Sequence, residues 1–423
     1  MTPGKQTYQK PRGFSDILPA EVQQWQEIEQ AVHQVFQQYG YRELRPPIME
    51  HTELFARSIG ETTDIVEKEM FTIEREDGKN LSLRPEITAS LCRSVLEHHL
   101  LEQEPFQKFY YIGPSFRYEK PQKGRQRQFH QIGVEALGGA DPLLDLETIQ
   151  LIEHLFDDLG IDGYELHLNS MGCPECRPSY RSALKDHLRP RLEELCDNCE
   201  RRFDRNVFRV LDCKRDTCRE HSKDVPHIYD HLCEDCDEHW NEFIDHADQQ
   251  NLSYQTNPRL VRGLDYYTRT VYEFRNPDLG AQNALGGGGR YDGLIEELGG
   301  DPTPGIGFAL GIERMLLSLA EQEDEENDDQ PHAPDAFFVY IDDECKRKVY
   351  NLVQTLRGDG FSADLNYEDR SVKAQMRVAN RSGAPFVCIL GPDELEQNQI
   401  TVKEMESGDQ EQVDLERLTE YIG

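Results

Sequence analysis

Basic side chains gather in one segment of the chain, between Arg117 and Arg127, and their chemistry suits phosphate. This stretch holds five basic residues, three of them arginine, against one acid, Glu119. The planar guanidinium group of arginine can bind two oxygens of one phosphate or carboxylate. Polar side chains continue after the basic run, at Gln128, His130, Gln131 and Glu135. A solvated charged loop is the commoner explanation for such a run, but the polar stripe behind it favours the floor of an anion site.

Two strands are expected to carry this basic run. Aromatic and aliphatic residues precede it at 109–112, and polar and apolar residues nearly alternate over 129–136, as in a strand with one buried face. The segment 106–138 is therefore predicted to form an antiparallel hairpin with a long basic tip.

The glycine run 286–289, within GGGGRYDG, is the second unusual stretch. Its spacing fits neither the GxxxxGK[ST] loop nor a GxGxxG turn that opens a helix. The run indicates either a backbone that something approaches closely or a flexible hairpin turn.

The elements around these two stretches follow from periodicity. Helical spacing predicts helices over 19–39 and 141–159, and a short strand interrupted by Pro46 and Pro47 is expected at an edge or an interface. A strand through 81–83 is expected to lead into a helix that begins near Pro85. Further strands are expected at 164–170, 261–264 and 270–274, and GIGFALGIER predicts a strand that turns into a helix near Glu313.

Composition limits the kind of protein. The 423 residues allow two or three domains, and the net charge of −34 repels nucleic acid unless local basic patches bind it. The acid excess would suit a salt-rich cytoplasm, where long-range repulsion is screened. The N-terminus shows no apolar leader and no apolar run approaches a membrane span, so a cytoplasmic protein without a membrane partner is expected.

Changes in composition suggest the domain boundaries. Residues 1–169 and 251–322 form the main domain in this interpretation, and 170–250, rich in cysteine and charge, is an inserted, mostly helical domain. The acidic, proline-containing segment 323–334 is interpreted as a linker. Alternating strand and helix patterns over 335–423 predict a compact α/β domain with a mostly parallel sheet.

The cysteines of the insertion have metal-ligand spacing. Eight of the eleven cysteines fall within it, and they include three CxxC pairs. Such thiols indicate one or two structural Zn²⁺ sites; a redox pair or inert buried thiols are the alternatives. The candidate ligands are Cys173, Cys176, Cys196, Cys199, Cys213, Cys218, Cys233 and Cys236.

Four separated segments together resemble a known family. LRPEITA, the FRYE hairpin, LVRGLDYYTRTVYEF and GIGFALGIER resemble the motifs of class II aminoacyl-tRNA synthetases, and the third segment with GGRYDGL resembles a pair peculiar to histidyl-tRNA synthetases. The resemblance extends over nearly the whole chain. It implies an α+β catalytic domain on an antiparallel sheet, a helical insertion that leans on the tRNA acceptor arm, and a C-terminal anticodon-binding domain.

The resemblance also implies a reaction. L-Histidine would be activated with ATP and Mg²⁺ to histidyl-adenylate and pyrophosphate, and histidine would then pass to the 3′ end of tRNA(His). A homodimer is implied, formed through the strand with Pro46 and Pro47. Charge develops on phosphoryl oxygens in both steps, so positioning and electrostatic stabilisation should dominate catalysis.

Site residues are transferred by matching motifs. Arg262 and Arg117 are the implied catalytic residues. The implied ATP-binding residues are Arg117, Glu119, Arg125 and Arg314. The implied histidine-binding residues are Glu86, Thr88, Gln131, Glu135, Arg262, Tyr266, Tyr267 and Tyr291.

Contacts to tRNA are expected at two places. The hairpin tip would contribute Lys123 and Arg127. In the C-terminal domain four basic residues, spaced by three, four and four, are predicted to share one helix face. They are Arg370, Lys373, Arg377 and Arg381.

Two other functions compete with this interpretation. A regulatory or binding subunit could keep the fold without the chemistry, but such a relative is expected to lack the catalytic arginine or the anticodon-binding domain. A synthetase for another amino acid is disfavoured because Glu135 and the LVRGLDYY and GGRYDGL segments suit an imidazole ring.

Overall fold

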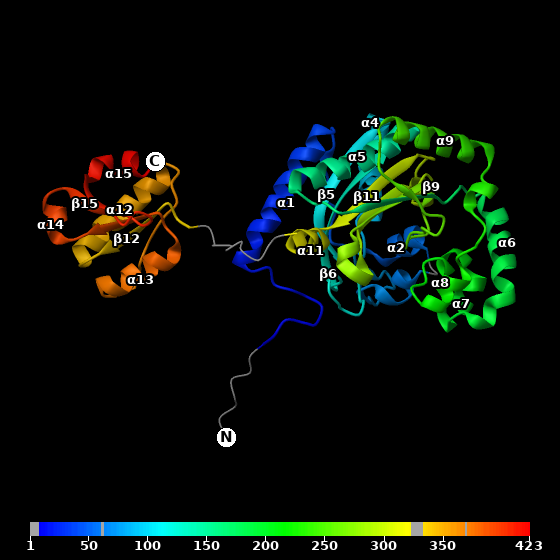
Figure 1. The fold of residues 1–423 in the computed structure, drawn as a ribbon, viewed down its shortest axis with the longest axis horizontal. Coiled ribbons are helices and arrows are strands. Elements are labelled where there is room, and N and C mark those ends of the chain that lie inside the picture. The colour runs from blue at the N-terminus through cyan, green and yellow to red at the C-terminus, as the bar shows by residue number, and fades with distance from the viewer. Residues whose placement is uncertain (1–7, 61–62, 323–332, 369) are drawn as a thin grey trace, which may run out of the picture. The chain divides into compact units, whose positions relative to one another are not determined.

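The computed structural model describes residues 8–60, 63–322, 333–368 and 370–423. The chain divides into two compact units, residues 1–326 and 327–423 (Figure 1). The predicted linker falls almost entirely outside the described residues. Each unit has its own sheet and its own hydrophobic core.

The first unit is built on an eight-stranded sheet in the order β1-β5-β6-β11-β10-β9-β7-β8. The pairs from β5 across to β7 are antiparallel, and only the edge strands β1 and β8 pair in parallel. The strands are β1 Arg42–Glu43, β5 Gln107–Phe116, β6 Gln128–Leu137, β7 Glu165–Ser170, β8 Gln255–Thr256, β9 Thr268–Arg275, β10 Ala284–Arg290 and β11 Gly305–Gly311. The predicted hairpin is therefore β5 and β6, and the glycine run lies inside a central strand, so it is not a flexible turn.

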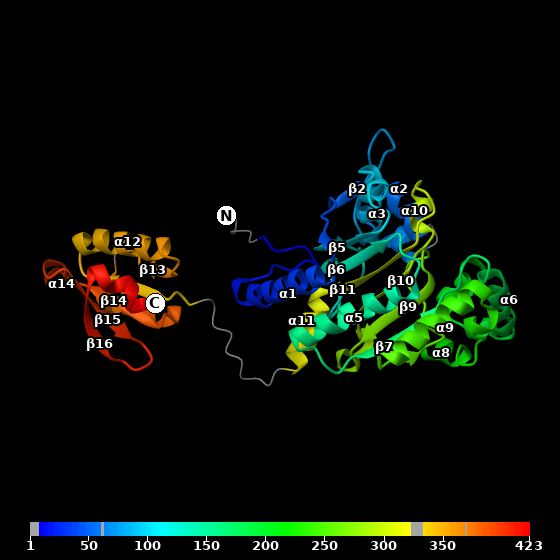
Figure 2. The same cartoon turned by 90° about the horizontal axis from the view of Figure 1, so that it is seen from above.

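Helices cover both faces of this sheet (Figure 2). One face is covered by α1 Pro19–Gln38, α5 Pro142–Leu159 and α11 Ile312–Gln322, whose apolar side chains share a core with those of β6, β10 and β11. The other face carries α2 Thr52–Ile59, α3 Thr88–Glu97, the short α4 Leu100–Gln103 and α10 Leu294–Glu297. A small sheet of β2 Met49–His51, β3 Thr72–Ile73 and β4 Leu81–Leu83 lies beside them, with the π-helical turn η1 Ile65–Glu69.

Three local expectations need correction. Residues 261–264 form a loop, because this segment leaves the sheet and contacts the insertion. The helix α3 begins at Thr88 rather than near Pro85, so Glu86 lies in the turn before it. The single strand expected around Pro46 and Pro47 is instead two short strands in different sheets, but both lie at sheet edges as predicted, because proline cannot donate to a ladder.

The insertion is helical, as its composition predicted. After β7 come α6 Arg177–Leu188, η2 Arg189–Glu194, α7 Asp197–Arg205, η3 Val207–Val210, α8 Asp216–His221, η4 Ile228–His231 and α9 Glu234–Gln249. Helix α9 packs against helix α5 and against strand β9 of the main sheet. Its residues Trp240 and Phe243 belong to the hydrophobic core of the first unit. The turn η5 Pro277–Gln282 connects β9 to β10.

The second unit has a five-stranded sheet in the order β13-β12-β14-β15-β16. It comprises β12 Ala336–Tyr340, α12 Asp343–Gly358, β13 Ala363–Leu365, α13 Val372–Ser382, β14 Phe386–Leu390, α14 Pro392–Glu396, β15 Gln399–Glu404, β16 Gln410–Asp414, η6 Leu415–Arg417 and α15 Leu418–Ile422. Only β13, β12 and β14 are parallel, so the sheet is mixed rather than mostly parallel. The hairpin β15–β16 adds the antiparallel part.

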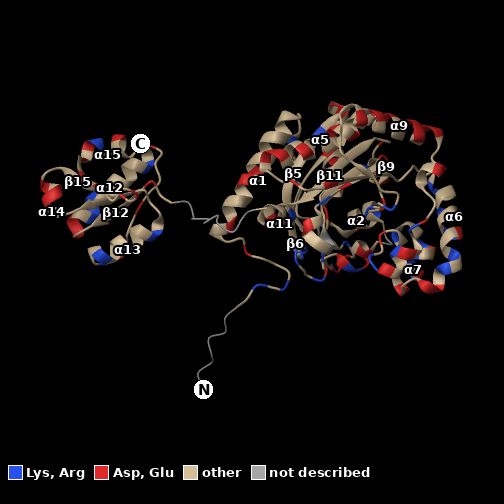
Figure 3. Cartoon of the chain, viewed as in Figure 1, with Lys and Arg blue, Asp and Glu red and all other residues tan. Residues whose placement is uncertain are grey.

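Charge is distributed unevenly over the helices. Figure 3 shows acidic residues along α9 and basic residues on α13. Among the residues that the structure describes, no helix is both long and apolar enough to cross a membrane.

A buried ionic network joins the sheet to two helices. Arg290, at the end of β10, lies 2.6 Å from Oδ1 of Asp145 on α5, and Nε2 of His239 on α9 lies 2.8 Å from Oδ2. Arg290 also donates to the main-chain oxygens of Gly139 and Asp141. Burial alone would raise the pKa of the Asp145 carboxyl, but Arg290 and His239 lower that pKa below its ordinary value.

We predict that Asp145→Ala destabilises the first unit strongly. The change leaves the buried Arg290 charge without its carboxylate, which costs about 3–5 kcal/mol of the free energy of unfolding. Chemical unfolding followed by tryptophan fluorescence measures this loss, because both tryptophans, Trp25 and Trp240, lie in the first unit. The matched control is Asp158→Ala, at an exposed position of the same helix. Equal stability of the two variants would contradict the proposed importance of the network.

Candidate functional site

A cavity of about 270 Å³ opens at the centre of the main sheet. Its lining comes from the turn before α3, the β5–β6 hairpin, the loop 261–267, strands β9 to β11 and the start of α11. All the residues predicted to bind ATP or histidine line it: Glu86, Thr88, Arg117, Glu119, Arg125, Gln131, Glu135, Arg262, Tyr266, Tyr267, Tyr291 and Arg314. The volume suits small molecules rather than a polymer.

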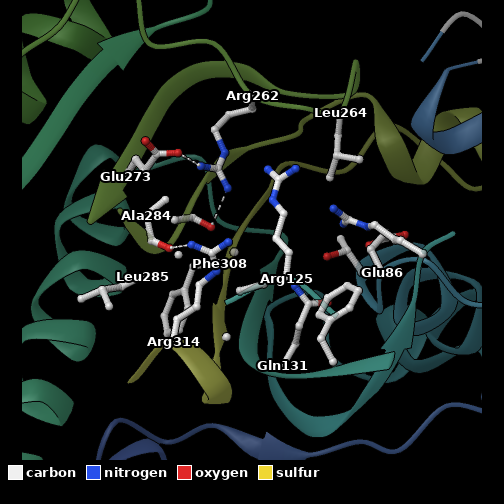
Figure 4. Close-up of a pocket in the computed structure, with 18 of the residues that line it drawn as sticks. Glu86, Arg125, Gln131, Arg262, Leu264, Glu273, Ala284, Leu285, Phe308 and Arg314 are labelled. Carbon is white, nitrogen blue, oxygen red and sulfur yellow. Dashed lines mark hydrogen bonds and ion pairs between the residues drawn. The ribbon is translucent and has the colours of Figure 1, made fainter. Parts of the chain in front are cut away.

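One end of the cavity is cationic. Arg125, Arg262 and Arg314 reach it from three different elements (Figure 4). Nη1 of Arg262 lies 3.0 Å from Oε1 of Glu273, and its Nη2 donates to the Gly287 oxygen at 3.2 Å. Nη1 of Arg314 donates to the Ala284 oxygen at 2.8 Å. Burial and the nearby Arg125 lower the pKa of Arg314, an effect that the neighbouring carboxylates of Glu119 and Glu273 oppose only in part.

Arg117 is a further arginine that lines the cavity. Its Nε donates to the Pro85 oxygen at 2.9 Å, and its guanidinium carbon lies 5.3 Å from the centroid of the Phe129 ring. The main chain of Arg117 closes the base of the hairpin, since its N–H donates to the Arg127 oxygen. One nitrogen thus anchors the guanidinium group, and the same group lines the cavity, which suits an anion-binding role.

The opposite end of the cavity is acidic and aromatic. The Thr88 hydroxyl donates to Oε1 of Glu135 at 2.5 Å, and the Tyr291 hydroxyl donates to Oε2. Oε1 of Glu86 accepts the Ala89 N–H at 3.0 Å. Burial raises the pKa of Glu135 to about 8, which the two hydroxyl donors counteract only in part, and burial also raises the pKa of Glu86.

This end therefore favours a ligand that supplies N–H donors or positive charge. A buried carboxyl with a raised pKa gains from any donor that stabilises its ionised form. Tyr266 and Tyr267, with ring centroids 4.7 Å apart, form the aromatic wall, and Tyr291 lies 5.7 Å from Tyr266. Gln131 completes the polar side, where its Oε1 accepts the Ser115 hydroxyl at 3.0 Å.

Glycines make room for the two key side chains. A Cβ atom on Gly307, which pairs with Glu135 across β11 and β6, would lie 2.0 Å from Oε2 of that carboxylate. A Cβ atom on Gly287 would lie 2.9 Å from Nη1 of Arg262. The close approach expected of the glycine run is thus made by the protein's own side chains as well as by neighbouring strands.

Some predicted residues lie away from the cavity. Lys123, at the hairpin tip, pairs with Glu321 at 2.9 Å, and Arg127 stacks 3.8 Å from the centroid of the Tyr118 ring. The remaining predicted tRNA residues belong to the second unit. Lys373, Arg377 and Arg381 are exposed on α13, but Arg370 precedes this helix and pairs with Glu368, so the four do not share one helix face.

The structure adds cavity residues that the sequence reasoning did not assign. Glu273, on β9, holds both Arg262 and Arg275, and Glu313 accepts the His130 main-chain N–H at 2.9 Å and contacts its ring. Alternation along β9 places Glu273 on the cavity side, and this signal was present in the sequence. Other unassigned lining residues are Tyr111, Gln126, Phe129, Leu264 and Phe308.

The eight cysteines of the insertion separate into two clusters. One contains Cys173, Cys176, Cys233 and Cys236, and the other contains Cys196, Cys199, Cys213 and Cys218. Within each cluster the sulfur atoms all lie within 4.8 Å of one another.

Family models match both units of the chain. Residues 13–315 match the model described as histidyl-tRNA synthetase, and residues 335–423 match the model described as an anticodon binding domain.

Curated relatives match over almost their full length. The chain is 47% identical to the histidine–tRNA ligase of Syntrophotalea carbinolica, with 97% of each chain covered. It is 48% identical to that of Natranaerobius thermophilus, covering 97% of this chain and 98% of the relative. Among solved structures, the apo histidyl-tRNA synthetase of S. aureus superposes with a TM-score of 0.81 at 37% identity, covering 98% of this chain and 100% of that one.

A more distant structure shares the fold alone. It is described as an ATP phosphoribosyltransferase regulatory subunit/histidyl-tRNA synthetase from Bacillus halodurans C, with a TM-score of 0.68 at 20% identity, covering 92% of this chain and 100% of that one.

The raised pKa of Glu135 predicts a pH-dependent stability. At pH values between the ordinary pKa of a glutamate and about 8, Glu135 keeps a proton in the folded protein that it has lost in the unfolded chain. The free energy of unfolding therefore falls as pH rises through this range. We expect Glu135→Gln to flatten this fall, measured as the free energy of unfolding at pH 5.5 and pH 8. Glu53→Gln, at an exposed position of α2, should keep the wild-type slope. Parallel pH profiles for wild type and Glu135→Gln would contradict the assignment.

Proposed function

Because this chain belongs to the histidyl-tRNA synthetase family, we propose that it is a histidine–tRNA ligase, which activates L-histidine with ATP and transfers it to the 3′ end of tRNA(His). The family model covers most of the chain, and the second unit matches an anticodon-binding domain. The protein is thus a class II aminoacyl-tRNA synthetase, an AMP-forming ligase.

The arrangement of Glu135 carries this proposal. Its carboxylate is buried at the acidic end of the cavity, between Thr88 and Tyr291, and it faces the same space as the catalytic arginines. An imidazole ring offers an N–H to a carboxylate and a second nitrogen to a hydroxyl group. We assign the ring to Glu135 and Tyr267, with Tyr266 and Tyr291 as the wall. Pairing of this kind rejects analogues because a mismatch leaves buried polar groups unpaired.

We assign the backbone of histidine to the middle of the cavity. Glu86 and Thr88 would accept the α-ammonium group, with Gln131 beside them. Glu86 lines the cavity, and its Oε2 has no hydrogen-bond partner among the described residues. This supports a role in binding the ammonium group. The carboxylate would then point toward Arg117 and Arg262.

The first step follows from these positions. A carboxylate oxygen of histidine attacks the α-phosphorus of ATP, and the bond from that phosphorus to the pyrophosphate oxygen breaks. We propose that Arg117 orients carboxylate and phosphate, and that Arg262 stabilises the charge that develops on the α-phosphoryl oxygens. Glu119 would lie on the adenine side, while Arg125 and Arg314 would hold the outer phosphates. The ion pair with Glu273 keeps Arg262 in position before ATP binds.

The second step uses the same cavity. The terminal ribose hydroxyl of tRNA attacks the carbonyl carbon of the adenylate and AMP leaves. We propose that Lys123 and Arg127, at the hairpin tip, contact the tRNA end, and that basic residues of α13 contact tRNA through the second unit.

We propose that two kinds of metal ion take part in this function. Mg²⁺ would neutralise ATP oxygens, since this ion prefers hard oxygen ligands such as phosphates. We also propose structural Zn²⁺ on the thiolates of the insertion.

A cytoplasmic homodimer is the assembly we propose. Its interface would include the segment around Pro46 and Pro47, whose main-chain oxygens accept hydrogen bonds from the buried Arg84. This segment is firmly held while the adjoining Ile48 is 48% exposed, which supports an interface there.

Amino-acid-dependent ATP–pyrophosphate exchange tests the activity directly. We expect exchange with histidine alone among the twenty amino acids, because only imidazole satisfies Glu135 and Tyr267 together. Exchange with none would favour a regulatory subunit, and exchange with another amino acid would refute the specificity.

Two variants show whether the exchange depends on the proposed site: one changes a catalytic arginine, and the other is a control. Arg262→Gln should lower the exchange rate about 10²–10³-fold, as does loss of one transition-state donor elsewhere. Lys185→Ala, on the outer helix α6, should leave it unchanged.

The role of α13 in tRNA binding is tested separately. Arg377→Glu with Arg381→Glu should raise the tRNA KM about tenfold or more at low salt, since each phosphate contact contributes a salt-dependent share of affinity. Histidine-dependent exchange should not change. Arg347→Glu with Lys348→Glu makes the same charge change on α12 and is the matched control. Unchanged tRNA kinetics in the α13 variant would remove α13 from the interface.

A further inference from the structure

The sulfur spacing inside the two cysteine clusters matches a tetrahedral metal site. A Zn–S bond of about 2.3 Å implies an S···S edge of about 3.8 Å in a tetrahedral ZnS₄ centre. Cys173 Sγ lies 3.6 Å from Cys176 Sγ and 3.7 Å from Cys233 Sγ. In the other cluster, Cys196 Sγ and Cys213 Sγ lie 3.9 Å apart.

These distances separate a metal site from the alternatives. A disulfide requires about 2.05 Å between sulfur atoms, and all eight cysteines are free. Inert buried thiols have no reason to converge in two groups of four. An iron–sulfur cluster places several irons and sulfides among its thiolates and so needs a wider cage than a single ion.

Main-chain N–H donors and arginine side chains lie close to the sulfur atoms of both clusters. The Cys233 N–H donates to Cys176 Sγ at 3.1 Å, and the Cys196 N–H donates to Cys218 Sγ at 3.2 Å. Arg177 lies within electrostatic range of Cys173, and Arg202 lies within range of Cys199. A ZnS₄ centre carries a net negative charge, which such groups stabilise.

From this geometry we infer that the insertion holds two separate tetrathiolate Zn²⁺ centres, and that both centres fix the loop 261–267 of the histidine pocket. The inner centre is Cys173, Cys176, Cys233 and Cys236, and the outer centre is Cys196, Cys199, Cys213 and Cys218. The second half of this inference rests on the proposed function, whereas the metal content does not.

The inner centre closes the insertion at its base. Cys173 and Cys176 follow β7, whereas Cys233 and Cys236 begin α9, which returns to the main sheet. The residue after Cys176 is Arg177, and its guanidinium group donates to the main-chain oxygen of Tyr267 in the wall of the pocket. The same side chain reaches the Met171 oxygen at 3.5 Å. A metal ion that fixes Cys176 therefore fixes the residue that holds Tyr267.

The outer centre acts on the other part of the same loop. Its ligands lie on α7, after η3 and on α8, so it fixes the segment between Cys199 and Cys213 at both ends. From that segment Asn206 donates to Oδ1 of Asp265 at 3.1 Å, and Arg209 donates to the Gly263 oxygen. Gly263 directly follows Arg262. The catalytic arginine and the pocket tyrosines are therefore held from outside by two metal-organised segments.

Metal content of the purified full-length protein tests the first half. We expect two zinc ions per chain by inductively coupled plasma mass spectrometry, and four sulfur ligands per ion by X-ray absorption. Cys196→Ser with Cys213→Ser should retain one ion per chain, and so should Cys173→Ser with Cys233→Ser. Cys345→Ser, in the second unit, should retain two. One zinc ion or fewer per wild-type chain, or nitrogen or oxygen ligands, would overturn the inference. This measurement uses the wild-type protein, so it does not depend on whether the variants fold.

The second half is tested with all eight cysteines in place. Arg177→Ala should keep two zinc ions, speed amide hydrogen exchange across residues 261–267, and raise the histidine KM in pyrophosphate exchange about tenfold, with a smaller effect on the ATP KM. Lys185→Ala is the control, because its ion pair with Asp204 stays within the insertion. Unchanged hydrogen exchange in Arg177→Ala would overturn the coupling. If the wild-type protein shows no histidine-dependent exchange, the proposed function would be overturned but the metal centres would not.

Discussion

The buried carboxylate of Asp145 is the interaction on which the first unit depends most. It lies on α5, pairs with Arg290 at the end of β10, and accepts from His239 on α9. The residue after Arg290 is Tyr291, which donates to Glu135. One carboxylate thus sets the distance between the sheet, a covering helix and the returning helix of the insertion, and it fixes one wall of the pocket through main-chain continuity.

Charge pairing explains how so acidic a chain maintains a phosphate site. At a net charge of −34 the long-range field opposes ATP and tRNA, yet local groups decide binding at short range. Arg125 pairs with Glu119 at 2.7 Å, and Arg262 pairs with Glu273 at 3.0 Å. Each guanidinium group keeps further N–H donors, so the carboxylates orient the arginines without consuming their capacity to bind phosphate.

Much of this arrangement was predictable from local pattern, and the remainder depended on tertiary contacts. Alternating polarity predicted β6, and motif matching placed Glu135 and Arg262 in one cavity. Residues 261–264 were predicted to be a strand but form a loop, in which Val261 packs into the hydrophobic cluster of the insertion, a contact that local periodicity does not encode. The position of Arg370 outside α13 was missed because residue spacing alone does not show where a helix begins. The division of the eight cysteines into two groups of four likewise required coordinates, since the sequence allows many groupings.

The glycine strand β10 has a consequence for the evolution of the pocket. A Cβ atom at any of residues 286–289 would lie 2.1–2.5 Å from a main-chain oxygen of a neighbouring strand, so the sheet itself resists substitution there. This part of the cavity floor is main chain and offers almost no side chains to mutate. An inhibitor that rests against β10 would therefore contact a surface with few viable resistance mutations, whereas one that relies on the tyrosine wall would meet side chains that a single codon change can alter.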